Sequence, residues 1–124
     1  MTIAWTTELL DQLDWHWTNH VRPSLDGLTD DEYLWQPVDG CWTIRPRSEK
    51  PDGPGTGDFT IDFSFPAPEP PPVTTIAWRL AHITVAGFGM RAASHFGGPA
   101  MSYDSVPYAG TAAEAVKQLD DAYA

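Results

Sequence analysis

The stretch TTIAWRLAHITVAGFGMRAASH, residues 74–95, decides the fold that we predict for this chain. Three prolines at 70–72 exclude a helix before it, and Thr74 or Thr75 can supply the N-cap oxygen. Gly97-Gly98-Pro99 ends the helix about six turns later. These limits predict one long central helix.

The apolar residues of this helix form two stripes at helical spacing. The first contains Ile76, Leu80, Ile83 and Met90, and the second contains Trp78, His82, Val85 and Gly89. A helix that is apolar over most of its circumference belongs between other helices, so we expect His82 to face protein or a lined cavity. Two interpretations stay open: a neutral histidine hydrogen-bonded in the core, or a metal ligand that needs two more ligands from other helices.

The chain has 124 residues, which predicts a single domain over residues 1–124. Seventeen acidic residues against seven basic ones give a net charge of −10, and no basic cluster is present beyond Arg45 and Arg47. This charge balance excludes nucleic acid as a partner. The sequence shows no basic, apolar leader and no membrane span, so we expect no membrane partner and a cytoplasmic location.

One cysteine, Cys41, excludes an intramolecular disulfide. Its position beside Trp42 favours a small buried apolar residue over a reactive thiol.

Residues 5–25 predict a first helix, whose inner face carries Leu9, Leu10, Leu13, Trp17 and Val21. Pro23 and Gly27 mark its end. The sequence from Thr29 to Glu32 is a capping box, which predicts a short helical turn near residues 30–35.

Residues 37–72 lose the helical period and are rich in proline and glycine, which predicts a long crossover. Within it, residues 41–44 and 60–65 favour a small hairpin or flap, and the apolar face of the second run would carry Ile61, Phe63 and Phe65. We interpret the crossover as a pad over one end of the helices, with a functional lid as the alternative.

A second capping box at Thr111 and Glu114 predicts a last helix over residues 111–124. Asp120 and Asp121 near its C-terminal end oppose the helix dipole, so we expect a helix interrupted in its middle, with a following segment absent.

Three stretches together, residues 9–46, 70–98 and 108–124, resemble the DinB-like superfamily of helical-bundle metalloproteins. The WRLAH element around His82 is the most specific part of this resemblance. The resemblance implies an all-α, up-down-down-up four-helix bundle, of which this chain would form about three helices.

The resemblance also implies a divalent metal, often zinc or nickel, with His82 as one of three ligands. The other two ligands in the family lie on a fourth helix, so the site would be incomplete here. Related enzymes are transferases and isomerases that use low-molecular-weight thiols such as bacillithiol or mycothiol. The implied function is therefore a metal-dependent, thiol-dependent transferase with unknown catalytic residues; the alternative is a non-catalytic binding or oligomerisation module.

Other histidines offer further possibilities. His16 and His20 stand four residues apart on the first helix and in principle ligate one ion, although partly exposed polar residues are the simpler interpretation. His95 is most simply a residue near a helix C-terminus. An incomplete bundle exposes apolar surface, so we expect a homo-oligomer, and a second chain could complete a site.

Overall fold

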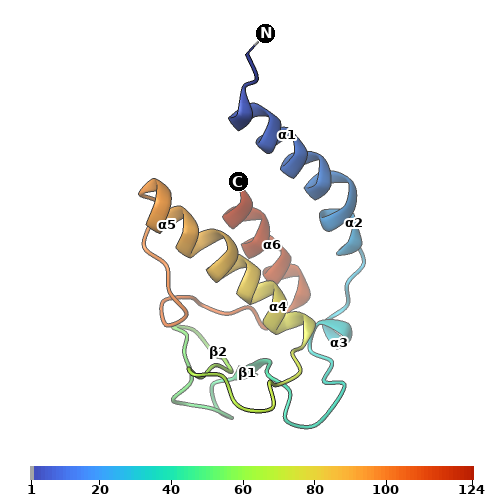
Figure 1. The fold of residues 1–124 in the computed structure, drawn as a ribbon. Helices are drawn as coiled ribbons and strands as arrows, with labels where there is room; N and C mark the ends of the chain where they lie inside the picture. The colour runs from blue at the N-terminus through green and yellow to red at the C-terminus, as the bar shows by residue number, and fades with distance from the viewer. Residues whose placement is uncertain (1) are drawn as a thin grey trace.

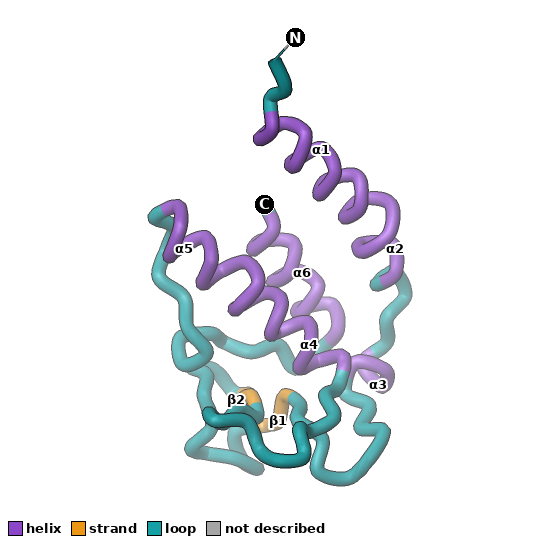
Figure 2. The backbone as a smooth tube through the Cα atoms, in the orientation of Figure 1, coloured by secondary structure: helices purple, strands orange, loops and turns teal. Residues whose placement is uncertain are grey.

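The computed structural model describes residues 2–124. Its helices form two long rods and a shorter third helix, and a two-stranded hairpin with long loops lies at one end of them (Figures 1 and 2). The predicted all-α class with a small hairpin is confirmed. The elements are α1 (Trp5–His16), η1 (Trp17–Val21), α2 (Arg22–Ser24), α3 (Asp30–Tyr33), β1 (Ile44–Pro46), β2 (Phe59–Ile61), α4 (Ile76–His82), η2 (Ile83–Gly89), α5 (Met90–Phe96) and α6 (Ala112–Tyr123).

The helix boundaries follow the local signals in the sequence. Thr75 is the N-cap of α4 and its hydroxyl accepts a hydrogen bond from the Trp78 backbone N–H. Gly97, with φ of 70°, ends α5 in the left-handed region that favours glycine. The capping box between Thr29 and Glu32 is present in full at α3. Among residues 2–124, no helix combines the length and apolarity that a membrane crossing requires.

The central rod consists of α4, η2 and α5. It contains a π-helical segment, η2, that the sequence analysis did not predict. Across η2 the backbone bonds span five residues, and the Met90 N–H donates to the Val85 carbonyl. The buried residues of this rod are Ala77, Leu80, Thr84, Val85 and Gly89, which lie on one face. The predicted first stripe is wrong except at Leu80, since Ile76, Ile83 and Met90 are 38%, 39% and 39% exposed.

The core lies where α6 packs against α4 and η2. Three residues of the loop after α5, Val106, Tyr108 and Ala109, are buried in it, as is Tyr33, whose hydroxyl donates to the Ala109 carbonyl at 2.8 Å. The buried cluster comprises Trp17, Tyr33, Ile44, Ile61, Ala77, Leu80, Val85, Val106, Tyr108, Ala109, Ala112, Ala115 and Leu119.

The first rod, which consists of α1, η1 and α2, is attached only near its C-terminal half. Trp17 stacks on Tyr123 with ring centroids 4.1 Å apart, and Arg22 makes a bidentate ion pair with Asp120 at 2.7 and 3.0 Å. None of the α1 residues is buried, and Figure 1 shows the N-terminal part of α1 reaching away from the other helices. The predicted inner face of this helix is therefore wrong at Leu9, Leu10 and Leu13, which are 63%, 58% and 48% exposed.

The crossover forms an antiparallel hairpin in which Ile44 pairs with Ile61, and both side chains enter the core at the base of α4 and α6. Figure 1 shows this hairpin and its loops beneath one end of the helices, as the pad interpretation expects. The expected apolar face is wrong beyond Ile61. Phe65 is 90% exposed. Asp62 is buried, and its charge is compensated by ion pairs with Arg45 and Lys50 and by a hydrogen bond from the Thr43 backbone N–H.

Candidate functional site

His82 is the last residue of α4 and lies on the surface of the central rod. Its side chain is exposed, so the expectation that it faces protein or a lined cavity is wrong. The reason is the position of the helix: the core takes up the face that carries Ala77, Leu80 and Val85, and the loop that reaches His82 through Tyr103 leaves its side chain exposed.

Aromatic rings nevertheless surround His82 on that surface. We call this group the aromatic cluster; it consists of Trp42, Phe63, Trp78, His82 and Tyr103. The imidazole stacks on Trp78 with centroids 4.9 Å apart and planes within 15°, while Phe63 stacks on Tyr103 at 4.6 Å. The Trp78 indole N–H donates to the Asp62 carbonyl at 2.8 Å. The crossover, α4 and the loop after α5 thus meet at His82.

A single hydrogen bond fixes the orientation of the imidazole. Its Nδ1 lies 2.6 Å from the Tyr103 hydroxyl, whereas Nε2 has no hydrogen-bond partner among the described residues. Burial raises the pKa of the Tyr103 phenol, so this hydroxyl is neutral at physiological pH. The arrangement leaves Nε2 as the nitrogen that is available to an external group.

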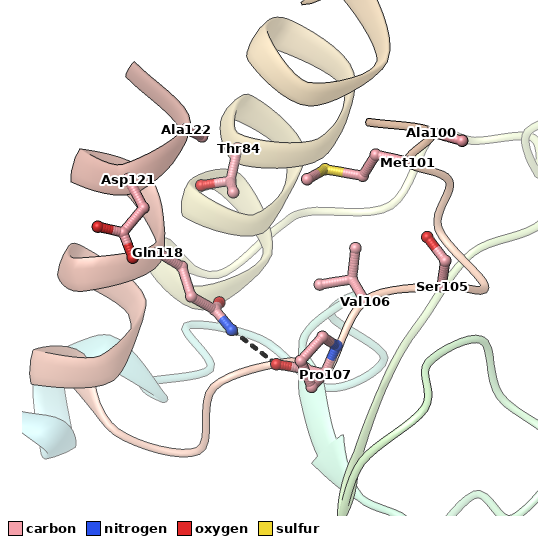
Figure 3. A pocket seen from close by; sticks show the side chains of 9 residues that line it. All are labelled: Thr84, Ala100, Met101, Ser105, Val106, Pro107, Gln118, Asp121 and Ala122. Atoms are coloured by element: carbon pink, nitrogen blue, oxygen red, sulfur yellow. Dashed lines mark hydrogen bonds between the residues drawn. The ribbon is translucent and has the colours of Figure 1, made fainter. Parts of the chain in front are cut away.

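The loop over residues 97–110, which supplies Tyr103, also forms a pocket against η2 and α6 (Figure 3). The pocket holds about 360 Å³ and is mainly apolar, with Met101, Val106 and Pro107 on the loop side. Thr84, only 6% exposed, projects into it from η2. On the α6 side Gln118 lines it and donates to the Pro107 carbonyl at 2.6 Å. His82 is not among the lining residues.

The remaining candidate residues lie apart from His82. His16 and His20 are exposed on the first rod, with ring centroids 5.4 Å apart. His95 is exposed in the last turn of α5, as expected for a residue near a helix C-terminus. Cys41 is buried, with its thiol donating to the Val38 carbonyl at 2.9 Å, which agrees with the apolar interpretation.

The ligand set for a metal ion is incomplete within the described part of the chain. Residues 2–124 contain no group of three or more His, Cys, Asp or Glu side chains that could hold one ion. A catalytic zinc site normally has three protein ligands. His82 therefore fits one position of such a site, and the described residues do not fit the whole of it.

Sequence reasoning did not identify Tyr103 as part of this site. Tyr103 lies 21 residues beyond His82 and reaches it only because the loop after α5 folds back. No local motif encodes this contact. The loop conformation depends on Tyr108, whose hydroxyl donates to the Tyr103 carbonyl at 2.6 Å, and on close packing of Met101 against Gly89.

Comparison with known proteins adds one finding. The family model of the DinB superfamily matches residues 12–124. The search found no match among curated proteins and none among solved structures.

Proposed function

The chain belongs to the DinB superfamily, and we propose that it is a divalent-metal-dependent enzyme that uses a low-molecular-weight thiol to transfer or rearrange a group. In this proposal His82 is a metal ligand through Nε2. A zinc or nickel ion at this position would supply a lowered pKa to a thiol bound to it.

The observation that carries the proposal is the restraint on the His82 ring. Histidines that bind metals almost always use their second nitrogen in a hydrogen bond, which fixes the tautomer and the ring plane. Here the Tyr103 hydroxyl engages Nδ1 at 2.6 Å and Trp78 stacks against the ring, so an exposed side chain is held in one orientation. With an ion at Nε2, Nδ1 would carry the proton and would donate a hydrogen bond to the phenol oxygen of Tyr103.

The other parts of the proposal are the remaining ligands and the substrate. Two further ligands would come from a second chain or from another segment. We assign the small-molecule partner to the pocket in Figure 3, because its volume of about 360 Å³ suits a small organic molecule. The loop over residues 97–110 contributes Met101 to this pocket and Tyr103 to the contact with His82.

The alternative function is a bundle that binds or oligomerises without metal. The absence of a three-ligand group in residues 2–124 favours this alternative. The two hypotheses differ in one measurable quantity, which is the metal content at His82.

The test is elemental analysis of the protein expressed from its own gene, after loading with Zn²⁺ or Ni²⁺ and removal of loosely bound ions. We expect a tightly held ion that is lost in His82→Ala. His95→Ala is the matched control, because His95 is also an exposed histidine of the central rod. Full metal content in His82→Ala would contradict the ligand assignment. A metal-free wild type would favour the non-catalytic module.

A further inference from the structure

The exposed histidine pair of the first rod has a role in neither the fold nor the proposed function. His16 is the last residue of α1, and His20 lies one turn later in η1. Both side chains are exposed, and neither ring makes a hydrogen bond to another described residue. Their centroids are 5.4 Å apart and their planes are inclined by 35°.

This separation matches two imidazoles on one metal ion. With Zn–N distances of about 2.0–2.1 Å and tetrahedral angles, two rings that share an ion have centroids about 5 Å apart. Paired histidines one turn apart on a helix are an established way to bind zinc. Imidazole nitrogens favour Zn²⁺, Ni²⁺ and Cu²⁺ over Mg²⁺ and Ca²⁺, which prefer oxygen.

Two histidines fill only half of a tetrahedral site, and residues 2–124 offer no third side chain of a ligating type. The face that carries the pair also carries exposed apolar residues. Trp5, Leu9 and Leu13 precede His16 at spacings of four, four and three residues, and all three are at least 48% exposed. An isologous contact between two copies would double the histidines and cover these apolar side chains at once.

We propose that His16 and His20 form half of a zinc-type metal site, which the same pair from a second copy of the chain completes. The charge of the chain supports the role of the ion. Each copy carries a net charge of −10, so two copies repel at low ionic strength, and a divalent cation at the contact offsets part of this repulsion. This site is separate from His82 and stands independently of the proposed function.

The experiment is a titration of the intact chain with Zn²⁺ alone at low ionic strength, followed by sedimentation velocity and calorimetry. We expect the mass to double, with one ion per two chains bound beyond what the His16→Ala/His20→Ala double variant binds, and a chelator to restore the monomer. Mg²⁺ should leave the monomer unchanged. Because both histidines are exposed, His16→Ala and His20→Ala should fold normally and should each lose the zinc-dependent dimer.

Matched controls separate this site from the other histidines. His82→Ala and His95→Ala should dimerise with zinc as the wild type does. Three results would overturn the proposal: one ion per monomer without dimerisation, no response to zinc, or a zinc-dependent dimer that persists in the His16→Ala/His20→Ala double variant. Circular dichroism verifies that each variant keeps the helical fold.

Discussion

Asp62 shows how a single buried charge is accommodated in this fold. Its carboxylate is 6% exposed and accepts from the Thr43 backbone N–H, the Arg45 guanidinium and the Lys50 ammonium, at 2.9, 2.9 and 3.2 Å. These bonds compensate for lost hydration, and they connect β1 to the residue that follows β2. The Asp62 carbonyl in turn holds the Trp78 indole beside His82.

Replacing the carboxylate at this point should therefore destabilise the protein. Hydrogen bonds to charged groups contribute about 1.5–3 kcal/mol, so we expect Asp62→Asn to lower the free energy of unfolding by about that amount. The exposed Asp58 in the same crossover provides the control, and Asp58→Asn should change stability by less than about 0.5 kcal/mol. Urea denaturation measures both, and equal losses in the two variants would contradict the role of Asp62.

The hydroxyl of Tyr103 is the only hydrogen-bond partner of the His82 ring among the described residues. Tyr103→Phe keeps the ring that stacks on Phe63 and removes only the partner of His82 Nδ1. We expect stability to fall by less than about 1.5 kcal/mol, since the lost bond is exposed to water. The ¹⁵N chemical shifts of the His82 ring should change, because its tautomer is no longer fixed. Tyr123→Phe is the control, because the hydroxyl it removes bonds to Asp14 and not to His82. Unchanged His82 shifts in Tyr103→Phe would contradict the restraint.

At the scale of elements, the first rod depends on a few anchors at its C-terminal half. Trp17 is the only buried residue of α1, η1 and α2, and it contacts Phe88 and Tyr123. The Tyr123 hydroxyl also donates to Asp14, and this bond raises the pKa of Tyr123 to about 12. The rod is therefore attached mainly by Trp17 with its two aromatic partners, by the partly buried Val21 and by a small number of polar bonds.

Removal of the Trp17 side chain should detach the first rod from the central rod and α6. We expect Trp17→Ala to cost about 3–5 kcal/mol and to speed amide hydrogen exchange across residues 5–24. Exchange in α4 and α6 should change much less, because their mutual contact stays intact. Trp15→Ala is the matched control, since Trp15 is 61% exposed. Uniformly faster exchange throughout the protein would indicate that the rod is part of one cooperative unit.

The capping box of α3 predicts a pH dependence. The Thr29 backbone N–H and hydroxyl both donate to Glu32, which lowers the pKa of this carboxyl below its ordinary value of 4.5. A group with a lowered folded-state pKa stabilises the protein above its unfolded pKa and loses this effect as the pH falls through the folded value. Wild type should therefore exceed Glu32→Gln in stability at pH 7, and the difference should shrink toward pH 3. A difference that stays constant in denaturation experiments over this range would refute the assignment.

Sequence reasoning succeeded at the signals that act within one turn of chain. Thr29, Thr75 and Gly97 cap or end helices where expected, because their effect depends only on adjacent backbone groups. It failed where burial depends on distant elements. Leu9 and Leu13 have the spacing of an inner face, but no other element covers them. On the central rod, the face that packs in the core carries Ala77 and Val85 and not Ile76 and Ile83. The contact between Tyr103 and His82 required the folded loop.

At the scale of the whole molecule, charge and exposed apolar surface have opposite effects on association. A net charge of −10 produces repulsion between copies, whereas Trp5, Leu9 and Leu13 leave an uncovered apolar face on α1. The acidic pair near the end of α6 adds little to this repulsion, because Asp120 binds Arg22 and Asp121 binds Lys117. Which effect prevails therefore depends on ionic strength.

Salt should consequently strengthen self-association when no metal is present. At about 0.1 M salt the screening length falls to about 10 Å, which weakens repulsion between copies but leaves apolar contacts intact. We expect the wild type in chelator to associate more as salt increases, as measured by sedimentation equilibrium. Leu9→Gln/Leu13→Gln should suppress this association while it changes monomer stability by about 0.5 kcal/mol or less per site, because both side chains are exposed. Association that weakens with salt would instead assign the contact to ion pairs and leave the apolar face of α1 without a role in it.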